Sequence, residues 1–318
     1  MIINIRFIFD TKNQLNSPKI YIKDVYLDFV SMLKEGVIYM SDKIKIATIY
    51  FSATGTTKKV IDYIIKGIDG EVISSIDLTK RDNREKKQNL SFLDVDLIII
   101  GAPIYGGFLY KEFRNCIKYL DFQGKCIIGI TLYGNAATIF ATKELISIIK
   151  KGNGRLLGYG EFVGEHSYSS KDIPVAKGRP NDDDLQTALI FGENIRKILL
   201  DKDNQHFYYK VSLFDKIISF IADIKPVHTG KGIFTIPYTD KEKCINCYKC
   251  VKLCPKSCID DEIMTNRDEC IVCMACVKIC PACARVSYPQ NTIVKFGLNI
   301  INKRKHKSHF VVLKHNKI

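Results

Sequence analysis

The chain has 318 residues, 46% of them hydrophobic and 26% charged, which is long enough for two domains and typical of globular proteins. Charged residues break the apolar runs near Met1, which disfavours a signal peptide. No run of about 18 uncharged apolar residues occurs, which disfavours a membrane span. We therefore expect a cytoplasmic protein. The formal net charge is +14, but a nucleic-acid partner is disfavoured because no recognition helix or aromatic stacking motif accompanies the lysines.

Residues 1–40 form an extension ahead of the first predicted strand. The extension contains no repeat, and Met40 stands directly before Ser41, Asp42 and a regular apolar run. These observations favour Met40 as the true initiator, with residues 1–39 untranslated. A translated extension stays open as the alternative.

Residues 41–200 alternate short apolar runs with helical patterns, which is typical of a parallel sheet with crossover helices. The predicted strands span residues 43–51, 71–78, 95–103, 125–135 and 155–164. The predicted helices span residues 58–68, 111–120, 138–151 and 185–200. This order predicts an α/β domain built on a doubly wound, five-stranded parallel sheet.

A hydroxyl-rich turn joins the first predicted strand to its helix. Backbone N–H groups, hydroxyls and the positive end of the helix dipole bind phosphate at such a position. The turn lacks the lysine of a Walker loop and the G-x-G-x-x-G of a dinucleotide fold, so a nucleoside triphosphate and NAD fit poorly. The predicted phosphate-binding residues are Ser52, Ala53, Thr54, Gly55, Thr56 and Thr57.

Two further loops follow the third and fourth predicted strands, and His166 follows the fifth. Because the carboxyl ends of parallel strands share one edge of a sheet, we expect these residues beside the same ligand. The predicted binding residues of the two loops are Pro103, Ile104, Tyr105, Gly106, Tyr133, Gly134 and Asn135. His166 is a candidate to supply or stabilise a proton, and an ordinary loop histidine is the alternative.

Residues 201–233 are predicted as a helical linker, and residues 291–318 as a basic C-terminal tail. Within the linker, residues 208–225 place apolar side chains at helical spacing. Packing of this helix against one or both domains is favoured over docking on a membrane surface. For the tail, which combines lysines with an apolar patch, a solvated or weakly ordered state is favoured.

Ten of the twelve cysteines lie between Cys244 and Cys283, and their short regular gaps indicate a metal site rather than disulfides. The motif C-x2-C-x2-C-x3-C-P occurs twice, each cysteine displaced by 26 residues from its counterpart. Three closely spaced thiolates can wrap one face of a four-iron cluster, and the fourth then ligates the other cluster. One predicted ligand set is Cys244, Cys247, Cys250 and Cys280, and the other is Cys254, Cys270, Cys273 and Cys276. Zinc is a weak alternative at this spacing, and Cys258 and Cys283 are predicted as packed side chains rather than further ligands.

The cysteine region, residues 234–290, resembles a bacterial two-cluster ferredoxin domain. That resemblance implies two neighbouring [4Fe–4S] clusters in a small pseudo-symmetric α+β domain of ferredoxin-like fold. The turn and the two later loops of residues 41–200 resemble the FMN site of flavodoxins, in which Tyr105 and Tyr133 would flank the isoalloxazine ring. Residues 43–290 together resemble the flavodoxin–ferredoxin fusion proteins of anaerobic bacteria known as ferrodoxins. The chain departs from flavodoxins in having no tryptophan and a basic charge.

The resemblance implies an electron-transfer protein that relays electrons between two [4Fe–4S] clusters and a bound FMN. The basic charge favours an acidic redox protein as the partner. One alternative is a flavin-dependent reductase of a specific organic substrate, although no separate substrate domain or catalytic carboxylate pair is visible. The other alternative is an iron–sulfur redox sensor or docking module whose flavodoxin-like domain holds no flavin.

Overall fold

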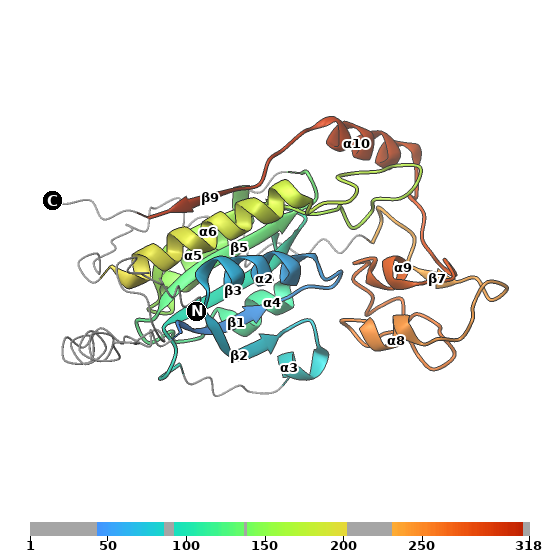
Figure 1. The fold of residues 1–318 in the computed structure, drawn as a ribbon. Helices are drawn as coiled ribbons and strands as arrows, with labels where there is room; N and C mark the ends of the chain where they lie inside the picture. Colours follow the sequence, from blue (N-terminus) through green and yellow to red (C-terminus); the bar gives the residue numbers. More distant parts are fainter. Residues whose placement is uncertain (1–42, 86–91, 137–138, 202–230, 314–318) are drawn as a thin grey trace, which may run out of the picture. The chain divides into compact units, whose positions relative to one another are not determined.

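The computed structural model describes residues 43–85, 92–136, 139–201 and 231–313 (Figure 1). The extension 1–40 and the linker helix expected over residues 208–225 lie outside the described residues. The helices are α2 (Thr56–Ile68), α3 (Arg81–Glu85), α4 (Lys111–Ile117), α5 (Ile139–Lys151), α6 (Asp182–Leu200), α8 (Lys249–Leu253), α9 (Ala275–Ile279) and α10 (Thr292–Lys303). The strands are β1 (Lys45–Tyr50), β2 (Glu71–Asp77), β3 (Leu97–Tyr105), β4 (Phe108–Leu109), β5 (Cys126–Tyr133), β6 (Arg155–Val163), β7 (Tyr238–Thr239), β8 (Arg285–Val286) and β9 (His309–Val312). No helix in this described part of the chain has the length and apolar character needed to cross a membrane.

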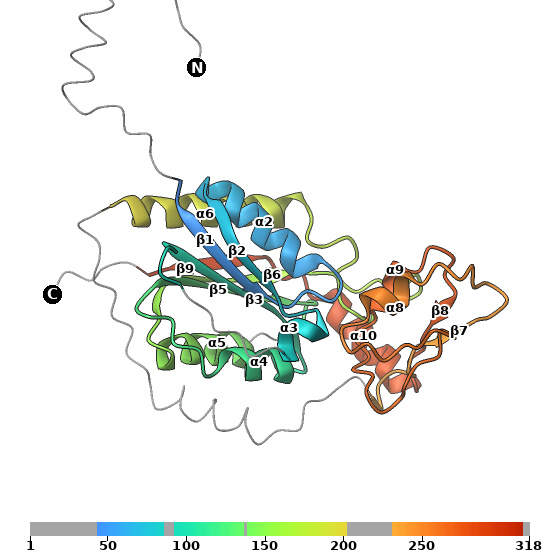
Figure 2. The ribbon, with the colours of Figure 1, turned by 90° about the horizontal axis from the view of Figure 1, so that it is seen from below.

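Five parallel strands form most of the main sheet, in the order β2-β1-β3-β5-β6. The strand order reverses between β1 and β3, so their carboxyl ends flank the switch point at which open sheets bind ligands. Figure 2 shows α2 and α6 on one face of this sheet and α4 and α5 on the other. The predicted α/β fold with a doubly wound parallel sheet is confirmed. The short strand β4 adds an antiparallel pairing to the end of β3.

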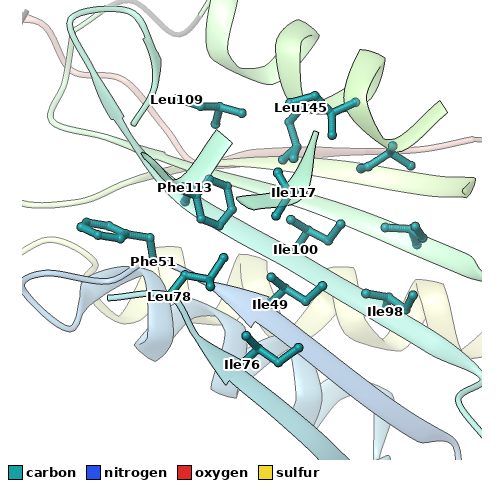
Figure 3. Close-up of a cluster of buried hydrophobic side chains, with 14 of the residues drawn as sticks. Ile49, Phe51, Ile76, Leu78, Ile98, Ile100, Leu109, Phe113, Ile117 and Leu145 are labelled. Carbon is teal, nitrogen blue, oxygen red and sulfur yellow. The ribbon is translucent and has the colours of Figure 1, made fainter. Parts of the chain in front are cut away.

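The central strand β3 is buried on both faces. Leu97 and Ile99 pack in the hydrophobic cluster beneath α2 and α6, whereas Ile98 and Ile100 pack in the cluster beneath α4 and α5. Figure 3 shows the second cluster, in which Leu145 of α5 lies over the sheet residues. This double burial explains the unbroken apolar run in the sequence, because neither face of the strand meets water.

The C-terminal segment differs from the predicted solvated or weakly ordered tail. That prediction is wrong for α10 and β9, whereas residues 304–307 between them are exposed. Residues 292–303 form α10, and β9 pairs antiparallel with β6, matching Glu161 with His309 and Gly158 with Val312. The ring of Phe310 stacks on Phe191 of α6, with ring centroids 4.9 Å apart. Partial burial of Phe310 and pairing of an otherwise open sheet edge are the physical reasons for this order.

The cysteine region has an internal repeat in its backbone as well as in its sequence. The first residues of α8 and α9, Lys249 and Ala275, are 26 positions apart, the same displacement as the cysteines. Strands β7 and β8 pair antiparallel as a two-stranded sheet. The buried Arg285 of β8 donates hydrogen bonds to the carbonyl of Pro237 (2.9 Å) and to Oγ1 of Thr239 (2.7 Å). These bonds join the two ends of the repeat, so the region closes into a small α+β unit.

Candidate functional site

The turn between β1 and α2 is held by hydrogen bonds from its own residues. Its last residue, Gly55, is the N-cap of α2 and has a φ of 81°, a left-handed conformation that glycine adopts readily. The N–H of Ser52 donates to Oγ1 of Thr79 (2.7 Å), and Oγ of Ser52 accepts the N–H of Lys58 (3.1 Å). Ser52 and Gly55 therefore fix the shape of the turn.

The first turn of α2 offers hydrogen-bond donors to an anion. Oγ1 of Thr57 is buried, and it has no hydrogen-bond partner among the described residues. Oγ1 of Thr54 and Oγ1 of Thr56 lie 3.3 Å apart, and no acidic residue occurs in the first turn of the helix. A buried hydroxyl without a partner costs roughly 1–3 kcal/mol, which a phosphate oxygen at this position would recover. The donor set at this helix terminus therefore fits a phosphate group.

A cavity of about 440 Å³ lies beside this turn, within the size range of small-molecule sites. The predicted site residues that line it are Ala53, Thr54, Thr56, Thr57, Pro103, Ile104, Tyr105, Gly106, Tyr133, Gly134 and His166. Three predicted residues, Ser52, Gly55 and Asn135, are not part of the lining. Nδ2 of Asn135 instead donates to the carbonyl of Ile301 (2.8 Å) at the end of α10. The structure thus brings together residues from four separate loops of the sequence around one cavity.

Aromatic side chains form much of the cavity wall. The rings of Tyr105 and Tyr110 meet edge to face with centroids 6.0 Å apart. Burial raises the pKa of Tyr105, and burial together with the nearby Glu161 raises the pKa of Tyr133 to about 12. Both phenols are therefore neutral near pH 7, so they present ring faces and O–H groups to a ligand rather than charge.

His166 lines the same cavity as a neutral imidazole. Its Nδ1 accepts the backbone N–H of Tyr168 (3.1 Å), which assigns the ring proton to Nε2. Burial, and to a smaller extent the positive charge of Lys278, lower the pKa of His166 to about 4. The ring can therefore donate a hydrogen bond from Nε2 near pH 7, but it carries no charge. In this state His166 would act on a ligand by donating a hydrogen bond from Nε2, rather than as a positively charged acid.

The two cysteine motifs fold into turns with left-handed residues at matching positions. Asn246 and Val272 have φ values of 52° and 53°, and Tyr248 and Met274 have φ values of 54° and 62°. Left-handed φ is unfavourable for residues other than glycine, and most unfavourable for a β-branched valine. Turns that alternate right- and left-handed residues direct successive N–H groups into one concavity, which suits an anionic group. The repeated geometry therefore fits the binding of a thiolate cluster in each motif.

A small cavity lies at the centre of one predicted ligand set. The cysteines that line it are the four of that set, Cys254, Cys270, Cys273 and Cys276, and also Cys258. The N–H of Val272 donates to Sγ of Cys270 (3.4 Å), and the guanidinium of Arg285 donates to Sγ of Cys276 (3.7 Å). In the other predicted set, the N–H of Ala284 donates to Sγ of Cys280 (3.2 Å). Hydrogen bonds to sulfur stabilise cluster thiolates, so this donor set fits iron–sulfur ligation.

The two remaining cysteines of the region differ from one another. Cys258 is buried, with its Sγ 3.5 Å from Sγ of Cys254, as expected for a packed side chain. Cys283 is exposed, so the prediction that it is packed is wrong. Its φ of 51° matches that of the exposed Ser257, 26 residues earlier, which places Cys283 at a surface turn of the repeat. Among the described residues, no group of three or more His, Cys, Asp or Glu side chains is arranged so that it could hold a metal ion.

The cavity beside α2 and the cysteine cavity share a wall. Ile271, Val272 and Cys273 line the cavity beside α2, and Ile271 and Cys273 also line the cysteine cavity. Ala275 follows directly and is buried in the hydrophobic cluster beneath α4 and α5. The cysteine region is therefore packed on the carboxyl edge of the sheet, with one ligand loop facing the cavity.

Ion pairs hold the cysteine region to the sheet domain at a second place. Nζ of Lys256 lies 2.6 Å from Oε1 of Glu112, and Nε of Arg84 lies 3.3 Å from Oε2 of the same carboxylate. Arg84 also donates to the carbonyl of Pro255, which directly follows Cys254. Burial alone would raise the pKa of Glu112, but the hydrogen bond and charge of Lys256 outweigh it and the pKa is lowered. Glu112 is thus a charged anchor for the loop that carries Cys254.

Sequence reasoning missed two residues beside His166. Tyr168 lines the cavity, and its ring stacks on that of Phe234 with centroids 4.1 Å apart. Glu165 also lines the cavity, and its Oε1 lies 2.8 Å from Nζ of Lys278. An aromatic residue next to a loop histidine was a local signal for Tyr168. The pairing of Glu165 with a lysine 113 positions later leaves no signal in one sequence.

Two families match separate parts of this chain. Residues 47–141 match the family described as flavodoxin domain, and residues 236–288 match the family described as 4Fe-4S dicluster domain. The first match covers the turn at α2, and the second covers both cysteine motifs. The domain order is that of a flavodoxin–ferredoxin fusion, and both domains support a role in electron transfer. No curated protein matches the sequence of the whole chain or of a part of it.

Several solved structures resemble the sheet domain at low sequence identity. A flavodoxin from the domain Archaea is 16% identical, with a TM-score of 0.33, and the match covers 49% of this chain and 98% of that chain. Flavodoxin 2 from Bacillus cereus is 17% identical, with a TM-score of 0.34, covering 50% and 99%. The rubredoxin oxygen:oxidoreductase of Desulfovibrio gigas is 15% identical, with a TM-score of 0.37, covering 54% and 40%. These likenesses concern the fold alone.

Proposed function

We propose that this chain, in which a flavodoxin domain precedes a 4Fe-4S dicluster domain, relays electrons between two [4Fe–4S] clusters and one FMN. The observation that carries the proposal is the shared wall, in which Ile271 and Cys273 line both cavities. A flavin and a cluster held in these cavities would be separated by a single loop. The relay would then need no second protein between its two kinds of cofactor.

Separate sets of residues would bind the two kinds of cofactor. The hydroxyls of Thr54, Thr56 and Thr57 would hold the FMN phosphate, and Tyr105 and Tyr133 would flank the ring system. The proposed cluster ligands are Cys244, Cys247, Cys250 and Cys280 in one set and Cys254, Cys270, Cys273 and Cys276 in the other. When bound, the clusters exchange single electrons and FMN accepts one or two. The chain itself positions these groups and excludes water from the wall between them.

The proposed external partner is an acidic redox protein that docks beside the set containing Cys244 and Cys247. Both cysteines are partly exposed, and 63% of the surface of Ile245 between them is accessible to solvent. Lys249 and Lys252 are exposed on the adjoining helix α8. An apolar contact beside positive charge favours fast docking of an acidic protein. Electrons would then pass from the partner to the cluster held by Cys244, Cys247, Cys250 and Cys280 (the outer cluster), then to the cluster held by Cys254, Cys270, Cys273 and Cys276 (the inner cluster) and the flavin, or in the reverse direction.

The first test is the cofactor content of protein purified without oxygen. We expect about one FMN and about eight iron atoms per chain, with a broad visible absorption band that dithionite bleaches. Clusters without flavin, even after addition of FMN, would refute the relay and leave the sensor or docking alternative. Reoxidation of the reduced flavin by one organic compound alone would instead favour the reductase.

The second test compares two neighbouring cysteines in rapid-mixing experiments. Cys254→Ser should remove the inner cluster and strongly slow the reduction of FMN by electrons that enter at the outer cluster. Cys258→Ser is the matched control, because this buried thiol lies beside Cys254 and is not a predicted ligand. It should retain both clusters and the wild-type rate. Equal rates of flavin reduction in the two variants would contradict the proposed path.

A further inference from the structure

Helix α10, labelled in Figure 1, has two apolar stripes, one packed and one exposed. Leu298 is buried, and Val294 and Ile301 pack against the same hydrophobic cluster as the cysteine loop. These positions are spaced by four and three residues, so they share one face of the helix. This stripe fixes α10 to the rest of the chain.

The second stripe is exposed. Ile293, Phe296 and Ile300 are 80%, 65% and 44% accessible to solvent, and their spacing of three and four residues aligns them on one face. Three large apolar side chains aligned in this way are unusual on a solvated helix of 12 residues. An aligned stripe of this kind indicates a surface that becomes buried against an apolar phase.

The chain around this stripe carries only positive charge. The sequence contains no Asp or Glu after Glu269. The last residue of α10, Lys303, is exposed, and so are Arg304, Lys305 and Lys307 directly after the helix. None of these four side chains takes part in an ion pair within the part of the chain that the structure describes. Their charge is therefore available to an anionic surface.

Three of these basic residues, Arg304, Lys305 and Lys307, border a cavity of about 550 Å³. Its charged lining residues are Lys177, Arg179, Asp183, Asp184, Arg304, Lys305 and Lys307. Arg179 and Asp184 pair with each other, which leaves four cations and one carboxylate. A cavity with this balance suits the phosphate of an anionic headgroup.

We propose that α10 and residues 303–307 dock on an anionic lipid surface. The exposed stripe would enter the boundary between headgroups and acyl chains, and the lysines and arginine would contact headgroup phosphates. A second copy of the chain is a poor occupant because it presents the same positive charge. The combination of an aromatic and aliphatic stripe with flanking lysines is typical of interfacial helices. The proposal is independent of the relay, since neither the exposed stripe nor residues 303–307 line either of the two proposed cofactor cavities.

The test is cosedimentation of the cofactor-loaded full chain with lipid vesicles. We expect binding to vesicles of mixed phosphatidylglycerol and phosphatidylcholine, weakening at high salt, and little binding to phosphatidylcholine alone. The triple variant Ile293→Ser, Phe296→Ser, Ile300→Ser should bind on the order of 100-fold more weakly. The triple variant Lys303→Gln, Lys305→Gln, Lys307→Gln should also lose affinity on the order of 100-fold, since each charge near the surface contributes about fivefold.

Matched controls separate this surface from exposed residues elsewhere. Leu93→Ser with Tyr119→Ser removes apolar side chains that are 78% and 84% exposed, and should leave vesicle binding unchanged. A triple variant that replaces lysines with glutamine at Lys66, Lys80 and Lys197 controls for net charge in the same way. Absence of binding to anionic vesicles would overturn the proposal and favour an acidic protein as the occupant. Equal binding by the α10 variants and their controls would also overturn it, because another part of the chain would then hold the membrane.

Discussion

Replacement of Gly134 by alanine tests the close contact between the loop after β5 and the loop after β6. A Cβ atom added at Gly134 would lie 2.5 Å from Cδ2, 2.6 Å from Cα and 2.7 Å from Cβ of His166. Non-bonded carbon atoms pack at about 3.5–4.0 Å, so the backbone at His166 must move. Overpacking of this kind costs roughly 1–3 kcal/mol. Because Gly134 and His166 both line the cavity beside α2, the movement should alter the proposed flavin site itself.

The assay is titration of flavin-depleted protein with FMN, followed by quenching of flavin fluorescence. If the whole cost falls on the bound state, the Kd for FMN should rise by about 5- to 150-fold. Gly164→Ala is the matched control, because Gly164 lines the same cavity but its added Cβ would be 3.4 Å from the nearest atom, on Leu132. That variant should change the Kd by less than about threefold. Equal affinities in the two variants would refute the reasoning, since the two loops would then separate without cost.

Three further predictions concern the phosphate turn, the cavity histidine and the cysteine wall. Thr57→Val removes the unpartnered hydroxyl at nearly constant volume, so FMN affinity should fall by roughly 10- to 100-fold while riboflavin, which has no phosphate, binds unchanged in parallel titrations. The pKa of His166 falls from 6.5 to about 4 on folding, so the neutral ring contributes stability above pH 6.5 that is lost as the pH falls towards 4. Between pH 7 and pH 5, the free energy of unfolding, measured with denaturant, should therefore fall by about 2 kcal/mol more in the wild type than in His166→Gln. Equal decreases in the two proteins would show that the ring is not buried as a neutral group. Cys254→Ser should lower the iron content by about half and weaken FMN binding, whereas Cys258→Ser should change neither in iron analysis and FMN titration.

The parts of the fold that were predictable have local signals in the sequence. The apolar run of β3 reports burial on both faces, and the hydroxyl-rich turn before α2 lies where a parallel strand meets its helix. The cysteine spacing likewise determines the turns in each motif. Cysteines separated by only two residues can bind one group together only if the chain turns tightly around it. Each of these signals lies within about ten residues of chain, so no knowledge of distant partners was needed.

The parts that were missed depend on contacts between distant residues. β9 has only four residues, and its partner β6 begins 154 positions earlier, so the sequence around His309 gave no sign of sheet pairing. The ion pair of Glu165 with Lys278 and the contact of Lys256 with Glu112 join residues more than 100 positions apart. Which residues pair in this way depends on how the two domains pack. A single sequence without relatives carries no information on that packing.

Val272 belongs to two features at once: it lines the cavity beside α2, and it lies in the turn that carries two of the proposed cluster ligands. It lies between Cys270 and Cys273, has a left-handed φ of 53°, and lines the cavity beside α2. A β-branched residue keeps this conformation only when its surroundings impose it, and a cluster held by the two neighbouring cysteines would do so. Loss of the cluster would let Val272 relax and would change the wall that faces the flavin. Since coupling between two sites is reciprocal, FMN should in turn favour retention of the inner cluster, and the relay would be assembled as a unit rather than cofactor by cofactor.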